Sequence, residues 1–406
     1  MKKLISMLAA AALCAAMTGC SDDGGDIPLL PFEPSPESSS ISDDSSDSPP
    51  APDYGDVELP FAAQYYLKGE SDNTVTACKA LIKGAEEMDR SVSLRGLGIS
   101  SSQLGDLISL VVSTVPELTM VDSEYSYSTD KNDTVTECRF NYLYGEKERE
   151  HIRRELDTAA DVIVGAAAGL SDFDKLLSFH DAIIRKCTYT DRAESPYTAY
   201  GCLVEGEAVC EGYSKAFMML CQRSGIDCLI VYGTATRDEV TAHMWNKVRL
   251  DGEWYNFDIT WDDPVSSIGR DYIGYDYFAV SDRDISVNHE FDETGFMKYP
   301  DAVSDSENYF VKNGLYITDI SEADSILLSA ITDQLSAGSR YVQVKCSSDE
   351  VYNDFIEREF GGSSKNARIF DLLAAAAYAG GPSFDSSTYS VSKDEGMRIV
   401  TLILEV

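Results

Sequence analysis

Cys210, His243 and Asp258 are the residues whose types and order in this 406-residue chain could carry out nucleophilic chemistry. A thiolate attacks a carbonyl carbon, and it needs a partner that accepts a proton and later returns it to the leaving group. Histidine suits both steps near neutral pH. A carboxylate beside the ring would orient the imidazole and stabilise its cation. The three residues therefore predict an acyl-transfer site that works through a thioester.

Cys210 stands where a glycine-containing turn, Gly206 to Val209, passes into a largely apolar stretch from Tyr213 to Arg223. Gly225 ends that stretch, so the pattern predicts a buried helix with a cysteine at its N-terminal end. The free N–H groups and the positive end of the helix dipole favour a thiolate there and could hold an oxyanion. Taken alone, the segment fits a buried structural cysteine equally well.

The base has to come from one of four histidines. His151 lies in a charge-rich stretch, His180 on an apolar helical stripe that favours a packed role, and His289 in a polar segment predicted as a loop. His243 begins an alternating stretch that is typical of a strand. We therefore predict His243 as the base.

A hairpin relates His243 to Asp258. Residues Trp245–Leu250 and Trp254–Thr260 alternate like two strands around Asp251-Gly252, which predicts a two-residue turn. With that turn, His243 and Asp258 are diagonal neighbours on one face of the hairpin, roughly 7 Å apart before the side chains extend. A three-residue loop would put them on opposite faces, so the site requires the shorter turn.

Some neighbouring residues leave alternatives open. Asp262 and Asp263 compete with Asp258 as the orienting carboxylate, but they follow the predicted strand and are interpreted as solvated loop residues. The second donor to an oxyanion has no assignment, with Tyr200 and Trp245 as candidates.

Three blocks of sequence together resemble the bacterial transglutaminase-like superfamily, whose core is papain-like. The resemblance covers about residues 170–290 and implies an α+β fold with Cys210 as nucleophile, His243 as base and acid, and Asp258 as orienting residue. His180-Asp181 and Tyr277-Phe278 to Asp282 look like further landmarks of the family. The three blocks are Glu205–Tyr213 (EGEAVCEGY), His243–Asn246 (HMWN) and Trp254–Asp262 (WYNFDITWD).

The expected function is that of a cysteine acyl-transfer enzyme acting on peptide or glutamine amides. Resolution of the thioester by water makes it a peptidase or amidase, and resolution by an amine makes it a protein cross-linking transferase. Hydrolysis is slightly favoured because nothing in the sequence marks an amine channel. The alternative is a non-catalytic cell-surface binding module on the same scaffold.

No cofactor or metal is expected. Animal members of the superfamily need calcium, but the sequence lacks an Asp-x-Asp-x-Asp-Gly loop. Asp271 and Asp276, the nearest candidates, are interpreted as solvated. The chain has 33 basic and 69 acidic side chains and a net charge of −36, which argues against a nucleic-acid partner.

The N-terminus predicts export. Residues 1–19 carry Lys2-Lys3, a short apolar run and Thr18-Gly19 directly before Cys20, the layout of a lipoprotein signal peptide. We expect a lipid-modified Cys20 that holds the protein on the outer face of a bacterial cell membrane, with no other membrane contact. An ordinary secretory signal is the alternative. The expected partner is a protein or peptide substrate, with cell-wall peptide as one candidate.

The rest of the chain divides by composition into a disordered acidic Ser/Asp/Pro tether over residues 20–56, an N-terminal α+β domain over 57–145, a transglutaminase-like catalytic domain over 146–299 and a C-terminal α+β domain over 300–406. Outside the site we expect helices over 61–88, 103–115, 146–168, 171–186 and 321–335, strands over 123–128, 135–144, 340–346 and 397–406, and a hairpin turn at 313–314.

Cysteine usage is informative. Of ten cysteines, Cys14 leaves with the signal and Cys20 is expected to be lipidated, so eight remain. No Cys-x-x-Cys pair occurs among them, so a structural zinc site is not expected. If one thiol is reactive, the other seven cannot all pair. We therefore expect at least one more free thiol, which for an exported protein points to a reducing habitat.

Overall fold

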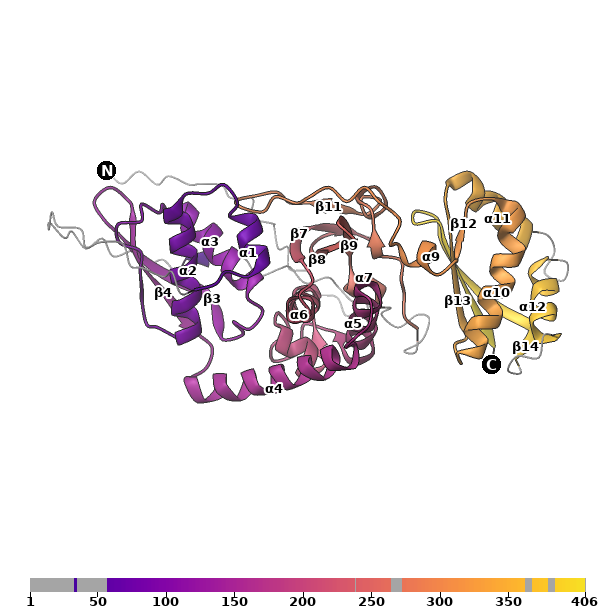
Figure 1. Ribbon diagram of the computed structural model, residues 1–406, viewed down its shortest axis with the longest axis horizontal. Coiled ribbons are helices and arrows are strands. Elements are labelled where there is room, and N and C mark those ends of the chain that lie inside the picture. The colour runs from indigo at the N-terminus through magenta and orange to yellow at the C-terminus, as the bar shows by residue number, and fades with distance from the viewer. Residues whose placement is uncertain are drawn as a thin grey trace, which may run out of the picture.

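The computed structural model describes residues 33–34, 57–237, 239–263, 272–361, 367–378 and 384–405. The predicted signal peptide, Cys20 and the tether lie outside the described residues, except for β1 (Glu33–Pro34), which pairs in parallel with β3. Among the described helices, none combines the length and the apolar character that crossing a bilayer requires. Three units follow one another along the long axis of the molecule (Figure 1).

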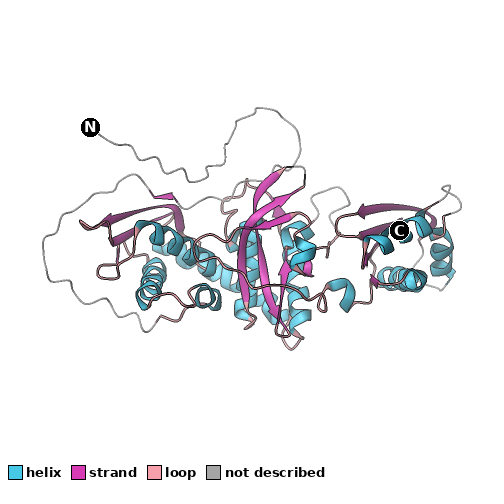
Figure 2. Cartoon of the chain, turned by 90° about the horizontal axis from the view of Figure 1, so that it is seen from above, coloured by secondary structure: helices cyan, strands magenta, loops and turns pink. Residues whose placement is uncertain are grey.

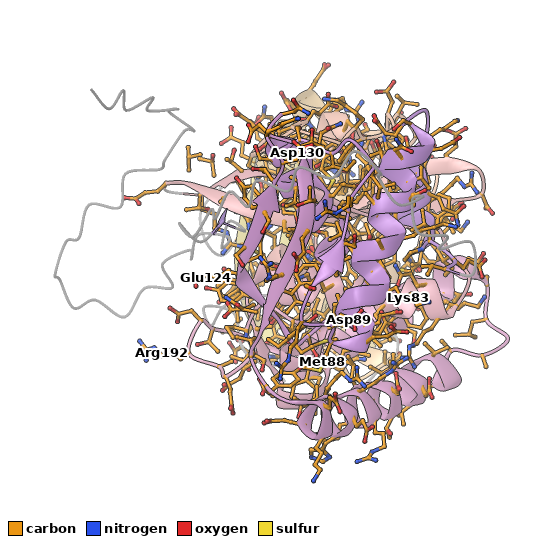
Figure 3. All side chains as sticks on the ribbon, turned by 90° about the vertical axis from the view of Figure 1, so that its left-hand side faces the viewer. Lys83, Met88, Asp89, Glu124, Asp130 and Arg192 are labelled. Carbon is orange, nitrogen blue, oxygen red and sulfur yellow. The ribbon has the colours of Figure 1, made fainter. Side chains whose placement is uncertain are left out.

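The N-terminal unit combines a small sheet, in the strand order β1-β3-β4-β2, with helices that pack against the central unit. The predicted β3–β4 hairpin is confirmed, and Figure 3 shows Asp130 at its turn. The single helix expected over 61–88 is two helices. The chain leaves the first near Gly69, whose φ of 93° is left-handed, and Ser71 caps the second by accepting from Thr74 N–H. The elements are α1 (Phe61–Tyr66), α2 (Asp72–Glu87), β2 (Val92–Ser93), α3 (Ser101–Thr114), β3 (Val121–Thr129) and β4 (Val135–Tyr142).

The central unit is built on an antiparallel sheet in the strand order β10-β9-β8-β7-β11. Figure 2, seen from above, shows strands crossing the middle of the molecule between the two outer units. Helix α6 is buried from Cys210 to Cys221 and packs on β7 and β8. The elements are α4 (Glu146–Ala166), α5 (Asp172–Lys186), β5 (Thr188–Tyr189), the π-helical turn η1 (Gly201–Glu205), β6 (Glu207–Ala208), α6 (Cys210–Arg223), β7 (Cys228–Thr236), β8 (Val240–Leu250), β9 (Glu253–Phe257), α7 (Ile259–Asp262), β10 (Phe278–Val280), α8 (Asp282–Ile285) and β11 (His289–Phe291).

The predicted hairpin is β8–β9, and its register is confirmed: Leu250 pairs with Glu253 across the turn. Asp251 and Gly252 have φ values of 50° and 88°, as a two-residue turn of type I′ requires. The second strand is shorter than expected. It ends at Phe257 instead of Thr260, because the next residue caps a short helix.

The C-terminal unit has its own apolar core, formed by a sheet in the order β12-β13-β15-β14 and the helices that cover it. The hairpin expected at Asn313-Gly314 is wrong. The pair ends a helix instead, with Asn313 as C-cap and Gly314 at a φ of 68°, because Asn and Gly suit helix ends as well as hairpins. The elements are α9 (Tyr309–Lys312), β12 (Tyr316–Ile317), the 3₁₀ turn η2 (Ile320–Glu322), α10 (Ala323–Ser336), β13 (Tyr341–Cys346), α11 (Asp349–Phe360), α12 (Ile369–Tyr378), β14 (Asp385–Asp394) and β15 (Ile399–Glu405).

Buried polar contacts join the outer units to the centre. Lys345 of β13 binds Asp284 of α8 at 2.6 Å, and both side chains are almost wholly buried. On the other side, the Tyr66 hydroxyl of α1 donates to the carbonyl oxygen of Ile230 in β7 at 2.5 Å. All eight cysteines beyond residue 20 are buried free thiols, so the expectation of a further free thiol is confirmed.

Candidate functional site

Cys210 is the first residue of α6, so its backbone N–H has no partner within the helix. The side chain is 1% exposed. Gly212, two residues further on, allows the segment before the helix to lie close: a Cβ at this position would come within 2.6 Å of the Pro196 carbonyl oxygen. The thiol is therefore held at a tightly packed helix N-terminus, as the sequence predicted.

Two buried side chains fix α6 against β8. The Ser214 hydroxyl donates to the Met244 carbonyl at 3.0 Å, and the Asn246 amide donates to the Ser214 carbonyl at 3.1 Å. Met244 follows His243 directly in the chain. These hydrogen bonds therefore set the position of the imidazole relative to the helix that begins with Cys210.

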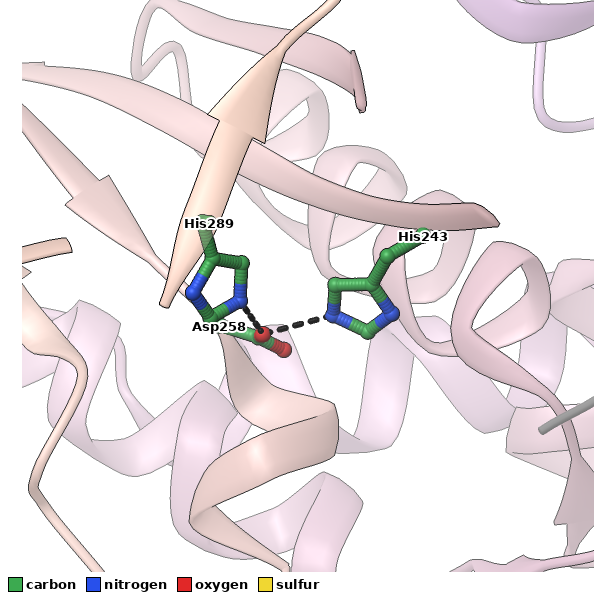
Figure 4. Close-up of side chains that lie close together, drawn as sticks. All are labelled: His243, Asp258 and His289. Carbon is green, nitrogen blue, oxygen red and sulfur yellow. Dashed lines mark hydrogen bonds and ion pairs between the residues drawn. The ribbon is translucent and has the colours of Figure 1, made fainter. Parts of the chain in front are cut away.

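His243 lies between a thiol and a carboxylate. Its Nε2 is 2.6 Å from Oδ2 of Asp258, the contact drawn in Figure 4. The side chain of Cys210 lies close enough to the same ring to contribute to the raised pKa of His243. Because Nε2 is already engaged by Asp258, Nδ1 is the atom left for the sulfur. The structure thus brings Cys210, His243 and Asp258 together in the order that the sequence predicted.

Asp258 is the N-cap of α7, and this explains where its carboxylate points. Oδ1 accepts from the backbone N–H groups of Thr260 and Trp261 at 3.0 and 3.1 Å. Oδ2 accepts from His243 and, at 3.0 Å, from Nε2 of His289. Burial alone would raise the pKa of Asp258, but the charge and hydrogen bond of His243 and the hydrogen bond of His289 together lower it well below its ordinary value. The carboxylate therefore stays ionised.

The protonation of His243 follows from these contacts. Burial lowers the pKa of the imidazole, but the charge and hydrogen bond of Asp258, with a further contribution from Cys210, raise it to about 10. The ring therefore holds its proton at neutral pH and presents a cation beside the side chain of Cys210. This arrangement can supply both a nucleophile and an acid.

His289 is a member of the site that the sequence did not reveal. It was expected in a polar loop, but it is 1% exposed and begins β11, which pairs with β7. Its Nδ1 lies 2.6 Å from Asn288 Oδ1, while its Nε2 holds Asp258. The strand has three residues, too few for alternation to be read from the sequence. The ring holds the carboxylate from the side opposite His243 (Figure 4).

Asp262 and Asp263 are not the solvated residues that were expected. Asp262 is 1% exposed, and its Oδ2 lies 3.1 Å from Nε2 of His180 on α5. Asp263 accepts from the Tyr213 hydroxyl at 2.5 Å, and burial raises its pKa to about 6. Neither carboxylate faces His243, so Asp258 has no competitor. The packed role expected for His180 is confirmed.

The candidate oxyanion donors have other partners. Trp245 Nε1 donates to Asn256 Oδ1 at 3.2 Å inside the core, and the Tyr200 hydroxyl donates to Glu155 at 2.8 Å. Both groups are therefore engaged away from the sulfur. The N–H group of Cys210 is one of those that the start of α6 leaves without a partner in the helix, and it remains as a donor for an oxyanion.

One set of side chains in the described residues could in principle hold a metal ion: ligand atoms of His243, Asp258 and His289 lie within 4.8 Å of one another. The two imidazoles already share Asp258 Oδ2, however, so a cation would replace the hydrogen bond that orients His243.

Asp276, expected to be solvated, is half-buried and accepts from Gln343 at 2.9 Å; burial and the charges of Asp262 and Asp394 raise its pKa to about 7. Asp271 lies outside the described residues.

Fold and site together define a class of protein: a mixed helix-and-sheet core in which a cysteine at the head of a buried helix meets a histidine and an aspartate from an antiparallel hairpin. Residues 157–259 match the model of the transglutaminase-like superfamily, which is a similarity over about a quarter of the chain. The match supports a cysteine enzyme in general terms, while the superfamily also includes inactive members. The curated proteins give no significant match to this chain.

Three solved structures are similar to parts of the chain. A candidate cysteine protease from Cytophaga hutchinsonii is 17% identical with a TM-score of 0.24, over 31% of this chain and 51% of that one. A structure described as a TGase is 12% identical with a TM-score of 0.25, over 36% and 52%. The structure of menin, described with its binding site for the Mixed Lineage Leukemia protein, is 10% identical with a TM-score of 0.25, over 80% and 67%. The chain thus spans about half the length of the first two, and at these scores none of the three carries an argument about function.

Proposed function

We propose that this protein is a cysteine acyl-transfer enzyme that cleaves peptide or glutamine amides through a thioester on Cys210. The observation that carries the proposal is the position of one imidazole, His243, which is bound to Asp258 at 2.6 Å and lies close enough to Cys210 for the thiol to affect its pKa. An inert scaffold has no need for a buried thiol, a protonated ring and an ionised carboxylate in line.

The chemistry follows from the charges. In the proposed first step the sulfur of Cys210 attacks the amide carbonyl carbon as a thiolate with its proton on His243, and the developing oxyanion accepts a hydrogen bond from a free N–H group of the helix terminus. The C–N bond then breaks as His243 returns the proton to the departing amine. Asp258 stabilises the imidazolium throughout. The product is a thioester on Cys210 and a free amine.

Water resolves the thioester in the proposed reaction, which makes the protein a peptidase or amidase. His243, neutral after the first step, takes a proton from the attacking water, and the carboxylic acid leaves as the thiolate returns. An amine in place of water would make the protein a cross-linking transferase. We further propose that the protein acts on peptide, including cell-wall peptide, on the outer face of a bacterial membrane, held there by a lipid on Cys20.

Labelling with iodoacetamide near neutral pH tests the thiolate. We expect Cys210 to react at least tenfold faster than the other cysteines, and this excess to disappear in His243→Ala. A matched control is Cys346→Ala, because Cys346 is buried in the separate C-terminal core and burial raises its pKa to about 12. Labelling of Cys210 no faster than the rest would support a binding scaffold instead.

Mass spectrometry of the protein incubated with blocked glutamine-containing peptides, with and without an added primary amine, tests the reaction itself. We expect an acyl adduct on Cys210 and release of free acid, both lost in Cys210→Ala and kept in Cys346→Ala. Amine-linked product in excess of acid at millimolar amine would replace hydrolysis with transfer.

A further inference from the structure

A cavity of about 250 Å³ lies between the N-terminal unit and the central unit, beside the first turn of α6. One wall is the segment from Leu118 to Ser123, which leads into β3, and the opposite wall is the loop 194–198. Glu211 and Lys215 of α6 complete it. In Figure 3, Arg192, two residues before this loop, and Glu124 of β3 lie on the same side of the molecule. Pockets between units are common ligand sites.

The cavity adjoins the proposed nucleophile. Glu211, which faces the cavity, follows Cys210 directly in the chain. The loop that forms the opposite wall is fastened to the same helix end, because the Val209 N–H donates to the Pro196 carbonyl at 3.0 Å. Tyr197 on that loop is close enough to Glu211 and Cys210 for their charges to add to the rise that burial causes in its pKa. The cavity therefore lies next to the residue that the proposed function uses as nucleophile.

Part of the lining is apolar. Val112 and Leu118 from the N-terminal unit face Pro196 of the loop, and Leu143 adds a side chain that is 60% exposed. An exposed leucine at the rim of a cavity is an unused apolar contact. An aliphatic chain inserted here would cover it.

The charges of the lining are unbalanced. Lys215 is bound to Glu211 at 2.6 Å, and each side chain is only 10% exposed, so the two cancel. Asp122 and Glu194 also face the cavity, and among the described residues neither has a basic partner. The cavity therefore carries two uncompensated negative charges beside an apolar surface.

We propose that this cavity is a substrate subsite for a primary ammonium group on an aliphatic stem, such as a lysine or another diamino acid of a peptide. The stem packs against Leu118 and Leu143 and the ammonium group lies near Asp122 and Glu194, as long basic side chains do when they bury the stem and keep the charge at the polar rim. The inference rests on the proposed function, and it gives the N-terminal unit a role as one wall of the substrate site.

Binding to the Cys210→Ala protein tests the subsite without any chemistry. Blocked peptides that contain one glutamine and, within two residues of it, either lysine or Nε-acetyllysine are titrated by calorimetry. We expect the lysine peptide to bind about fivefold more tightly at 0.15 M salt. The preference should vanish in a protein that also carries Asp122→Asn and Glu194→Gln.

The matched control carries Glu124→Gln and Asp133→Asn, which remove the same two charges from exposed positions of the N-terminal unit outside the cavity. A preference retained in this control assigns the effect to the cavity, while an equal loss in both double variants overturns the subsite in favour of the general charge of −36. Equal binding of the two peptides also overturns it. If the native protein turns over both peptides at equal rates, the subsite is wrong and the proposed function stands. If the lysine peptide binds selectively but no acyl adduct forms on Cys210, the subsite stands and the proposed function is wrong.

Discussion

A buried histidine–aspartate pair lies at each end of α7. His243 and Asp258 lie 2.6 Å apart before the helix, and His180 and Asp262 lie 3.1 Å apart at its end. Both rings have a raised pKa, in each case because carboxylate contacts outweigh the effect of burial. The two pairs are alike in residue type and burial, but contacts lower the pKa of Asp258 whereas burial raises that of Asp262.

They differ in what occupies the other side of the ring. His243 has the thiol of Cys210 there, whereas His180 has Asp181 at 3.2 Å and stacks on Tyr275 with 5.2 Å between ring centroids. One ring can pass a proton to a nucleophile, and the other is closed in by carboxylates and aromatic packing. A buried pair with a shifted pKa is therefore not by itself a catalytic pair. Whether such a pair can be catalytic depends on the group at the other side of the imidazole, which is a thiol for His243 and a carboxylate for His180.

The sharpest way to break the comparison is to neutralise each carboxylate in turn. Asp258→Asn keeps the helix cap but removes the charge that supports the His243 cation, and we expect kcat/KM for amide cleavage to fall on the order of 10³-fold. Asp262→Asn should change it less than about threefold. Both values are measured by steady-state kinetics with a peptide that the native protein cleaves. Equal losses in the two variants would mean that both pairs serve catalysis.

The pH profile should separate the pairs as well. The pKa of His243 in the folded protein is about 10, above the ordinary 6.5, so the ring acts as an acid up to high pH and kcat should fall only as the pH rises through about 10. In Asp258→Asn this basic limb should move down toward 6.5, while in Asp262→Asn it should stay. The stability that the raised pKa of His243 contributes should be fully present below about pH 6.5 and should be lost as the pH rises from there to about 10, as measured by urea unfolding. A basic limb near pH 7 in the native protein contradicts the assignment.

The second pair should matter for folding. His180→Phe keeps the ring packing on Tyr275 but leaves the fully buried carboxylate of Asp262 without its histidine, and we expect unfolding free energy to fall by about 2 kcal/mol. His151→Phe on the exposed face of α4 is the control and should change it by less than about 0.5 kcal/mol. Denaturant titration supplies the values. Activity per folded molecule should be retained.

The smallest effect concerns His289, which touches Asp258 but not the sulfur. His289→Gln keeps a donor but loosens the carboxylate, and we expect kcat to fall about tenfold with little change in KM. The basic limb should also shift, which a purely structural role would not cause. His151→Gln is the matched control. A kcat within twofold of the native value would remove His289 from the site.

Local rules predicted most of the site. The cysteine at a helix start, the two-residue turn at Asp251-Gly252 and the shared face of His243 and Asp258 all depend on residues near one another in sequence. Hairpin pairing and helix capping act over a few residues, so a single sequence carries them. The same kind of rule failed at Asn313-Gly314, where two local structures accept the same pair and the surrounding packing chose the helix end.

Contacts between segments that are distant in the sequence could not be predicted from local patterns. His289 reaches Asp258 across 31 residues, and His180 reaches Asp262 across 82. Neither histidine lies in a pattern that names its partner. The burial of Asp262, expected to be solvated, likewise depends on α5 packing over the end of α7.

The amino-acid sequence by itself determined which groups could react and which secondary elements would present them, because composition, periodicity and turn chemistry act over short stretches. Only the tertiary structure decided that one oxygen of Asp258 serves two imidazoles, that a second pair is closed off from any thiol, and that the N-terminal unit forms a wall beside Cys210. Those outcomes depend on how separate elements pack, and the position of a side chain in a packed core is set by neighbours from every part of the chain.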